Sequence, residues 1–346
     1  MKARWAKHTL KFRKAAQTSR GAYLEKPAYY LYLSEANNDF VAIGECGLLP
    51  GLSYDDKPGY EQQLDRLVNA INDKESLPPL HEWPSIALGL EMALLNLKHG
   101  EDGIIFPSAF TKGEDAIPIN GLVWMDSAQN MQQQIEEKLR EGFSCIKLKI
   151  GAIEFERELA LLASIRERFG PGEIEIRVDA NGAFKPGEAK EKLQKLAAFE
   201  LHSIEQPIMA GQWEDMAALC AESPVPIALD EELIGLIDAE EREAAMEHIK
   251  PQAIVLKPSL LGAFSVSDEW IQLAEDYGAR WWITSALESN VGLNAIAQYA
   301  YACGGSEQQG LGTGRLYTNN VEGPLEIRDG HLHHLPKRNW DYSVLP

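Results

Sequence analysis

The 346-residue sequence contains little cysteine and no long apolar run. Its four cysteines lie far apart and form no C-x-x-C pair, which excludes the usual disulfide scaffold and predicts reduced thiols in a cytoplasmic protein. The most apolar helical candidate, residues 85–97, is too short to cross a bilayer and contains Glu91. Lysine or histidine interrupts the apolar residues of segment 1–12, which argues against a signal peptide. We therefore expect a cytoplasmic protein.

Positive charge is scarce as well. The chain has 33 Lys and Arg residues against 52 Asp and Glu residues, for a formal net charge of −19. A phosphate backbone or an anionic membrane surface would be repelled, so we expect neither nucleic acid nor a membrane as a partner. With 45% hydrophobic and 25% charged residues, the composition is that of a globular protein, and it leaves the oligomeric state open.

What the chain does contain, from about residue 117, is a repeated alternation of strands and helices. Short β-rich runs are separated by segments with helical periodicity, such as residues 131–143. The runs are 117–124, 145–150, 174–180, 201–207, 226–231, 253–258, 281–287 and 310–314. Eight β/α units in about 200 residues predict a closed parallel barrel, with a doubly wound open sheet as the alternative. The last run is poor in strand formers, so the closing element is expected to be irregular.

The first part of the chain follows another order. Three alternating runs, at 5–12, 27–34 and 41–47, precede helical segments at 60–73 and 85–99. Strands followed by helices indicate an α+β arrangement. We predict an α+β capping domain over residues 1–115 and a barrel over 116–319. The segment 320–346 contains a hairpin around Asp329-Gly330 and is expected to return to the cap.

Ionisable residues recur at the ends of the predicted barrel strands. Lys149, Asp179, Glu205, Asp230 and Lys257 each lie at or near the C-terminal end of one run, with separations of 30, 26, 25 and 27 residues. In a β/α barrel these positions meet at the face that carries the active site. Lys147 lies two residues before Lys149 and so points to the same side, into the enclosed interior.

The chemistry of this set indicates a hard cation. Three carboxylates without histidine or cysteine favour Mg²⁺, with Mn²⁺ possible, over Zn²⁺. Each acid alone could instead cap the next helix, and the lysines could simply pair with the acids. A divalent ion flanked by ammonium groups suits removal of a proton α to a carboxylate, so we expect a small-molecule carboxylate as substrate. Lys149, crowded by Lys147 and partly desolvated, is the expected base.

On these motifs the sequence resembles the muconate-lactonising subgroup of the enolase superfamily. The matching pieces are K-x-K at 147–149, D-A-N at 179–181, E-Q-P at 205–207, D-E at 230–231 and Lys257. The resemblance implies a (β/α)7β TIM-like barrel with an N-terminal α+β cap. It also implies Mg²⁺ on the three acids at Asp179, Glu205 and Asp230, with Lys149 and Lys257 as acid/base groups on opposite faces of the substrate.

The stretch T-S-A-L-E-S-N-V-G-L at 284–293, followed by G-L-G-T-G at 310–314, resembles those members of the subgroup that catalyse one particular dehydration. The implied reaction is a Mg²⁺-dependent syn dehydration of a hydroxycyclohexadiene carboxylate with a succinyl arm, in menaquinone biosynthesis. Lys149 would remove the proton and Lys257 would stabilise the enediolate. Racemisation of N-succinyl amino acids or epimerisation of dipeptides by the same two lysines is the alternative. A metal-stabilised barrel without catalysis is a third possibility.

Further site residues are assigned by strand parity and position. The predicted substrate-binding residues are Lys147, Arg177, Ser285, Leu287, Gly312, Thr313 and Arg20. Asn181 and Glu231 are expected to orient the ligands and lysines. Arg177 shares its face with Asp179 and is expected to meet either the substrate or the acids. The loop at 18–27, with Arg20, Tyr23 and Leu24, is expected to close over the barrel mouth, and an ordinary surface hairpin is the alternative.

Overall fold

The computed structural model describes residues 1–18, 21–35, 39–99 and 103–346. Its first layer is an antiparallel sheet of β1 (Lys2–Thr18), β2 (Gly21–Ser34) and β3 (Val41–Cys46), in that order. Helices α1 (Tyr60–Asp73) and α2 (Pro84–His99) pack beside it. Both helices match their predicted ranges closely, because their apolar residues recur with helical spacing and are buried. This unit is the N-terminal cap.

The second layer is a curled parallel sheet of seven strands in the order β11-β10-β9-β8-β7-β6-β5. The strands are β5 (Gly121–Val123), β6 (Cys145–Lys149), β7 (Glu175–Asp179), β8 (Ser203–Glu205), β9 (Ile227–Leu229), β10 (Ala253–Leu256) and β11 (Arg280–Ile283). Neighbours in the chain are neighbours in the sheet throughout, which is the strand order of a β/α barrel and not of a doubly wound sheet. The strand centres are apolar and buried between the barrel interior and the surrounding helices.

The sheet closes without a regular eighth strand in the described part of the chain. Residues 309 and 310 form isolated bridges, Gln309 with Ile119 and Gly310 with Thr284. Gly310 N–H donates to Ile283 O at 2.8 Å, and Asn120 N–H donates to Gln309 O at 3.0 Å. The structure is thus a TIM-like barrel and not an open sheet, and the closing element is irregular, as predicted.

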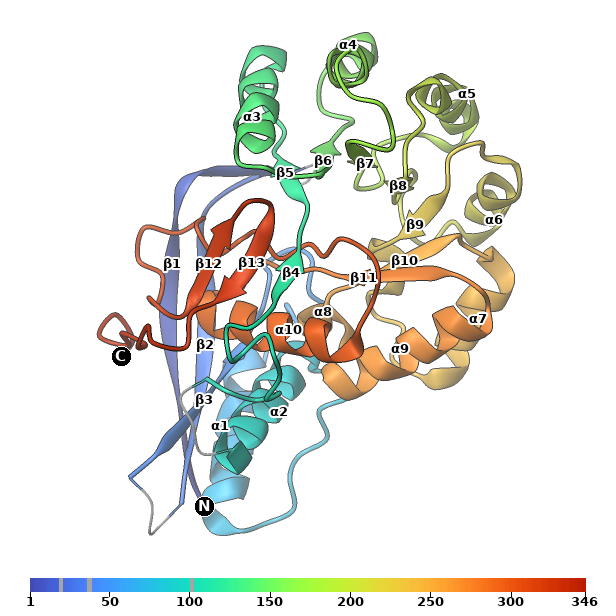
Figure 1. The fold of residues 1–346 in the computed structure, drawn as a ribbon. Helices are drawn as coiled ribbons and strands as arrows, with labels where there is room; N and C mark the ends of the chain where they lie inside the picture. Colours follow the sequence, from blue (N-terminus) through green and yellow to red (C-terminus); the bar gives the residue numbers. More distant parts are fainter. Residues whose placement is uncertain (19–20, 36–38, 100–102) are drawn as a thin grey trace.

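Helices cover the outer side of the curled sheet (Figure 1). The α-helices of this part are α3 (Ala128–Arg140), α4 (Phe155–Arg166), α5 (Pro186–Leu196), α6 (Trp213–Glu222), α7 (Ala239–Ile249), α8 (Pro258–Leu261), α9 (Phe264–Asp276) and α10 (Asn290–Cys303). Short 3₁₀ turns occur at Ala197–Phe199 and Glu231–Leu233. None of the helices in the described residues is long and apolar enough to cross a membrane.

The predicted strand at 117–124 is wrong as a single element. Its first part, β4 (Ala116–Pro118), pairs with β13 (His331–His334) of the C-terminal hairpin, whose other strand is β12 (Leu325–Arg328). Only the second part, β5, enters the barrel. Ile119 N–H still donates to Gly330 O of the hairpin at 3.1 Å, and pairing with β6 begins at Gly121, so the backbone changes partner between these two residues. Farther along the chain, Thr318 N–H donates to Lys11 O of β1 at 2.9 Å. The domain boundaries at 115 and 319 remain predictions.

Candidate active site

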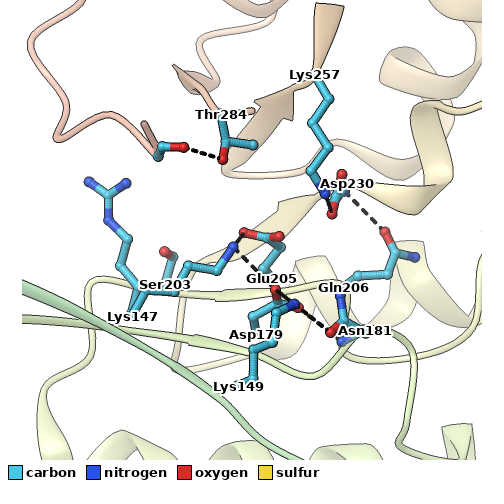
Figure 2. A network of polar contacts seen from close by, with 12 residues as sticks. Lys147, Lys149, Asp179, Asn181, Ser203, Glu205, Gln206, Asp230, Lys257 and Thr284 are labelled. Carbon is cyan, nitrogen blue, oxygen red and sulfur yellow. Dashed lines mark hydrogen bonds and ion pairs between the residues drawn. The ribbon is translucent and has the colours of Figure 1, made fainter. Parts of the chain in front are cut away.

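Five adjacent strands deliver charged side chains to one end of the barrel (Figure 2). Lys149 of β6 is paired in register with Asp179 of β7, and Asp179 with Glu205 of β8. Asp230 and Lys257 directly follow β9 and β10. Since parallel strands end at one edge, residues 25 to 30 positions apart in sequence become neighbours. The structure brings together all five of the residues that we expected at this face.

Lys147 and Lys149 both bind Asp179. Lys147 Nζ lies 3.1 Å from Asp179 Oδ2 and 2.5 Å from Glu205 Oε2, so one ammonium group bridges two carboxylates. Lys149 Nζ lies 2.9 Å from Asp179 Oδ2 and donates to Asn181 Oδ1 at 2.8 Å. Asn181 in turn donates to Glu231 Oε1 at 3.0 Å. Asn181 thus contacts Lys149 directly and Glu231 contacts Asn181, where we expected supporting residues.

Lys257 reaches the acids from the other side of the barrel. Its Nζ forms a short ion pair with Asp230 Oδ2 (Figure 2). Asp230 N–H donates to Gln206 Oε1 at 3.1 Å, which fixes the backbone that carries this carboxylate. Lys149 and Lys257 therefore flank the three acids from opposite sides.

Burial and charge shift the protonation of this cluster in opposite directions. Burial alone would lower the pKa of Lys147, but the charges of Asp179 and Glu205 outweigh it and raise that pKa to about 12. Burial, reinforced by the charge of Asp179, raises the pKa of Glu205 to about 8. Burial opposes ionisation of Asp179, yet Lys147 and Lys149 lower its pKa well below the usual range. Asp179 contacts the ammonium groups of both Lys147 and Lys149, whereas Glu205 contacts only that of Lys147 among the described residues.

The acids fit a hard divalent cation by their chemistry. All three are buried carboxylates, and Glu205 Oε1 is a buried oxygen without a hydrogen-bond partner among the described residues. Such an oxygen needs a cation or a donor to offset the loss of water. The ligand oxygens do not all lie within 4.8 Å of one another, because each acid is drawn to an ammonium group. Metal binding therefore requires these ion pairs to rearrange.

Another acidic group lies at the opposite end of β7. Ligand atoms of Glu175, His202 and Glu307 lie within 4.8 Å of one another. The guanidinium of Arg177 donates to Glu175 Oε1 at 2.6 Å and to Glu307 Oε2 at 2.9 Å, and Arg280 also lies beside Glu307. Two guanidinium groups already balance these carboxylates, so the cluster is a poor site for a cation.

Arg177 does not line the cavity described below, and its predicted role in substrate binding stays a prediction. Its side chain is 1% exposed and stacks over Trp282, with its guanidinium carbon 4.3 Å from the ring centre. Strand parity correctly places it on the inner face, but its side chain points toward Glu175, four residues from Asp179 and about 13 Å farther down the strand. Arg177 therefore fills the closed end of the barrel.

A cavity of about 100 Å³ lies at the charged end. Ten predicted residues line it: Lys147, Lys149, Asp179, Asn181, Glu231, Lys257, Ser285, Leu287, Gly312 and Thr313. The hydroxyl groups of Ser285 and Thr313 form a hydrogen bond of 2.6 Å. Tyr23 reaches the cavity from the cap, whereas Leu24 is 68% exposed. Arg20 lies outside the described residues.

Sequence analysis missed an apolar part of the cavity wall. Leu122 and Trp124 line the cavity from β5 and the residue that follows it, and Leu49 and Leu52 reach it from the loop after β3. Asn120, Leu122 and Trp124 alternate along the chain, so the parity argument used for the lysines would have found them. No comparable signal marks Leu49 and Leu52, because loop residues have no fixed period.

Comparison with known proteins agrees with this architecture. Residues 130–338 match the family described as Enolase C-terminal domain-like. An o-succinylbenzoate synthase of Desulfotalea psychrophila is 46% identical, over 96% of this chain and 98% of its own. The crystal structure of MenC from the same organism superposes with a TM-score of 0.86 at 43% identity, covering 96% of this chain and 99% of that one. An N-succinylamino acid racemase of Thermus thermophilus is 30% identical over 74% of this chain and 68% of its own.

Proposed function

The chain belongs to the Enolase C-terminal domain-like family, and on that premise we propose that it is an o-succinylbenzoate synthase. This enzyme is a carbon–oxygen lyase of menaquinone biosynthesis that converts 2-succinyl-6-hydroxy-2,4-cyclohexadiene-1-carboxylate to o-succinylbenzoate and water. The observation that carries the proposal is the near full-length similarity to the Desulfotalea synthase. We also infer that it works in the cytoplasm on this small molecule, without nucleic acid or membrane as a partner.

The proposed cofactor is Mg²⁺ held by Asp179, Glu205 and Asp230, with Mn²⁺ as a substitute. The proposal is supported by their all-oxygen chemistry and by the unpartnered oxygen of Glu205. Bound there, the ion would supply positive charge to the substrate carboxylate, which makes the α-proton easier to remove. Asn181 and Glu231 would orient the acids and Lys149.

Lys149 is the proposed base, and Lys257 the proposed electrostatic partner. As the neutral amine, Lys149 Nζ takes the proton α to the substrate carboxylate, and as the resulting ammonium it protonates the hydroxyl that departs from the same face. The C–H and C–O bonds break, a ring double bond forms, and one water leaves. Lys257 stays positively charged on the opposite side and stabilises the negative charge that builds on the carboxylate. Asn181 holds Lys149 in place through the 2.8 Å hydrogen bond.

The remaining cavity wall suits the two parts of this substrate. The hydroxyl pair of Ser285 and Thr313, together with the nearby Gly312 and Lys147, offers hydrogen-bond donors and positive charge for the succinyl carboxylate. Leu122 and Trp124 offer an apolar surface for the ring. We assign these roles as part of the proposal.

Racemisation of N-succinyl amino acids is the second candidate, because two lysines on opposite sides of one cavity are what a two-base reaction needs. The decisive experiment presents purified protein and Mg²⁺ with both substrates. We expect loss of the diene absorbance as the cyclohexadiene carboxylate is dehydrated. In parallel, N-succinyl amino acids in D₂O are followed for exchange at the α-carbon. Exchange without dehydration would refute the synthase assignment and establish the racemase, and turnover of neither substrate would refute both.

A further inference from the structure

A second buried charge cluster links the cap to the wall of the cavity. It consists of Lys26 in β2, Glu45 in β3 and Glu288 in the segment between β11 and α10. All three side chains are 0% exposed. Burying three ionisable groups costs free energy unless they bind one another or nearby dipoles, so the contacts of each indicate what the cluster does.

Glu288 ties two loops of the barrel face together. Its Oε2 accepts a hydrogen bond from Ala286 N–H at 2.7 Å, and its Oε1 accepts a short one from Ser259 Oγ. Ser259 lies two residues after Lys257, and Ala286 lines the cavity. The same wall contains Leu287, whose backbone has a positive φ of 63° that an aliphatic residue rarely adopts. One carboxylate therefore holds the turn after Lys257 against a wall segment that is not in a relaxed conformation.

Glu45 holds the next part of the chain from the cap. Its carboxylate accepts hydrogen bonds from Ser289 N–H at 2.8 Å, Ser289 Oγ at 2.5 Å and Gly292 N–H at 2.9 Å. These donors lie at the N-terminus of α10, where a negative charge is favoured by the helix dipole. The cap thus binds the residue immediately after Glu288.

Lys26 supplies the positive charge between the two acids. Its Nζ has no hydrogen-bond partner among the described residues, so its interaction with Glu45 and Glu288 is one of charge over distance. Burial lowers the pKa of Lys26, and the two carboxylates oppose that shift. Burial likewise raises the pKa of Glu288, and the charge of Lys26 opposes that shift, so the basic and acidic groups favour each other's charged forms.

The surrounding backbone leaves room for this cluster at two glycines. A Cβ on Gly47 of the cap would lie 2.9 Å from Glu288 Cγ and 2.8 Å from Ser259 Oγ. A Cβ on Gly292 would lie 2.8 Å from Glu288 Cβ and 2.9 Å from Glu45 Oε2. All four distances are shorter than ordinary Cβ contacts, so any other residue would force a neighbour to shift, and the cap and α10 close tightly around the Glu288 side chain.

We propose that Glu288 and Lys26 are positioning residues that hold the cavity wall at 285–287 for the substrate and couple it to the seating of the cap. Glu288 fixes the wall through Ala286 and Ser259, and Lys26 compensates its charge from the cap. Since the wall belongs to the proposed synthase site, the catalytic side of this inference rests on the proposed function.

The first test removes one hydrogen-bond donor to Glu288. Ser259→Ala deletes the hydroxyl that binds Glu288, and Ser267→Ala is the matched control. Ser267 is an equally buried serine in α9 whose hydroxyl donates to Ala263 O at 2.8 Å. We expect Ser259→Ala to lower kcat/KM about tenfold, mainly through KM, because a displaced wall misplaces the substrate. Equal kcat/KM in the two variants, at whatever loss of Tm, would overturn the positioning role.

The second test uses charge compensation. Lys26→Met should leave two uncompensated carboxylates, and Glu288→Gln in addition should remove one of them. We expect the double variant to recover at least about threefold in kcat/KM over Lys26→Met, and also to recover Tm, since interacting residues do not behave additively. Losses that simply multiply would overturn the proposed coupling. The Tm values of wild type, the two single variants and the double variant can be compared without any turnover. An inactive wild type would therefore refute the proposed function, whereas additive changes in Tm would refute the proposed interaction between Lys26 and Glu288.

Discussion

Asp55 in the loop that follows β3 should make the stability of the protein fall as pH rises from about 4 to 6. Its side chain is fully buried. Asp55 lies three residues after Leu52, which lines the cavity. One oxygen accepts hydrogen bonds from Ser85 N–H at 2.9 Å and Ser85 Oγ at 2.6 Å, and the other has no partner among the described residues. Burial raises the pKa of Asp55 from 3.8 to about 6 despite the hydrogen bonds from Ser85.

The sign and size of the effect follow from this difference. The folded chain keeps the proton to a higher pH than the unfolded chain, so the unfolding free energy decreases as pH rises through the window. A difference of about two pKa units amounts to about 3 kcal/mol in total. About 2 kcal/mol of this lies between pH 4.5 and 7. Asparagine cannot ionise, so the unfolding free energy of Asp55→Asn relative to wild type should rise by about 2 kcal/mol over that range.

Urea unfolding followed by circular dichroism at pH 4.5, 5.5 and 7 measures the difference. Titration of all other groups cancels between wild type and variant. Asp56→Asn, at the exposed neighbouring carboxylate, controls for the loss of one negative charge and should follow the wild type. A stability difference between Asp55→Asn and wild type that stays constant across the three pH values would refute the reasoning.

Three further predictions concern the site. Lys149→Ala should lower kcat at least ~100-fold, the usual minimum for a general base, with an unchanged circular dichroism spectrum; near-normal turnover would mean that another group removes the proton. Chelation by EDTA should abolish turnover, and Mg²⁺ should restore it better than Zn²⁺ in the same assay; full activity in the chelator would refute the metal. Arg177→Met should lower the unfolding free energy by about 3–5 kcal/mol, because Glu175 and Glu307 lose their buried partner. KM should change little in that variant. A large rise in KM at normal stability would instead support a role of Arg177 in substrate binding.

The position of the charged residues at one end of the barrel could be predicted because a parallel barrel imposes strict rules on where side chains point. Side chains alternate between faces, and strand ends meet at one edge, so residue type and spacing were enough to group Lys149 with Asp179 and Glu205. The same rules do not say toward which end of the barrel a long inward side chain will lean. Arg177 obeys the parity and still points to the closed end, because Glu175 and Glu307 lie there.

The course of the loops and the division of one predicted strand between two sheets could not be predicted on that basis. Leu49 and Leu52 reach the cavity through a loop whose course depends on tertiary hydrogen bonds, such as that from the Tyr23 hydroxyl to Pro50 O at 2.7 Å. The split of 117–124 into two strands depends on a hairpin about 200 residues later in the chain. Local pattern contains no information about a partner so distant.

The irregular element at residues 309–310, which closes the barrel, has a consequence for how such enzymes diversify. The charged residues lie on strands, or directly after strands, that are hydrogen-bonded to neighbours on both sides, so a change there disturbs several ladders. Gly310, Gly312 and Thr313 line the cavity from a stretch anchored by only a few backbone bonds in the described structure. A Cβ added at Gly310 would lie 2.2 Å from Thr284 Oγ1, whereas one added at Gly312 would make only an ordinary contact, 3.6 Å from Asn120 O. We therefore expect substrate preference to change through substitutions at 312–313, with Gly310 and the charged residues of the strands retained.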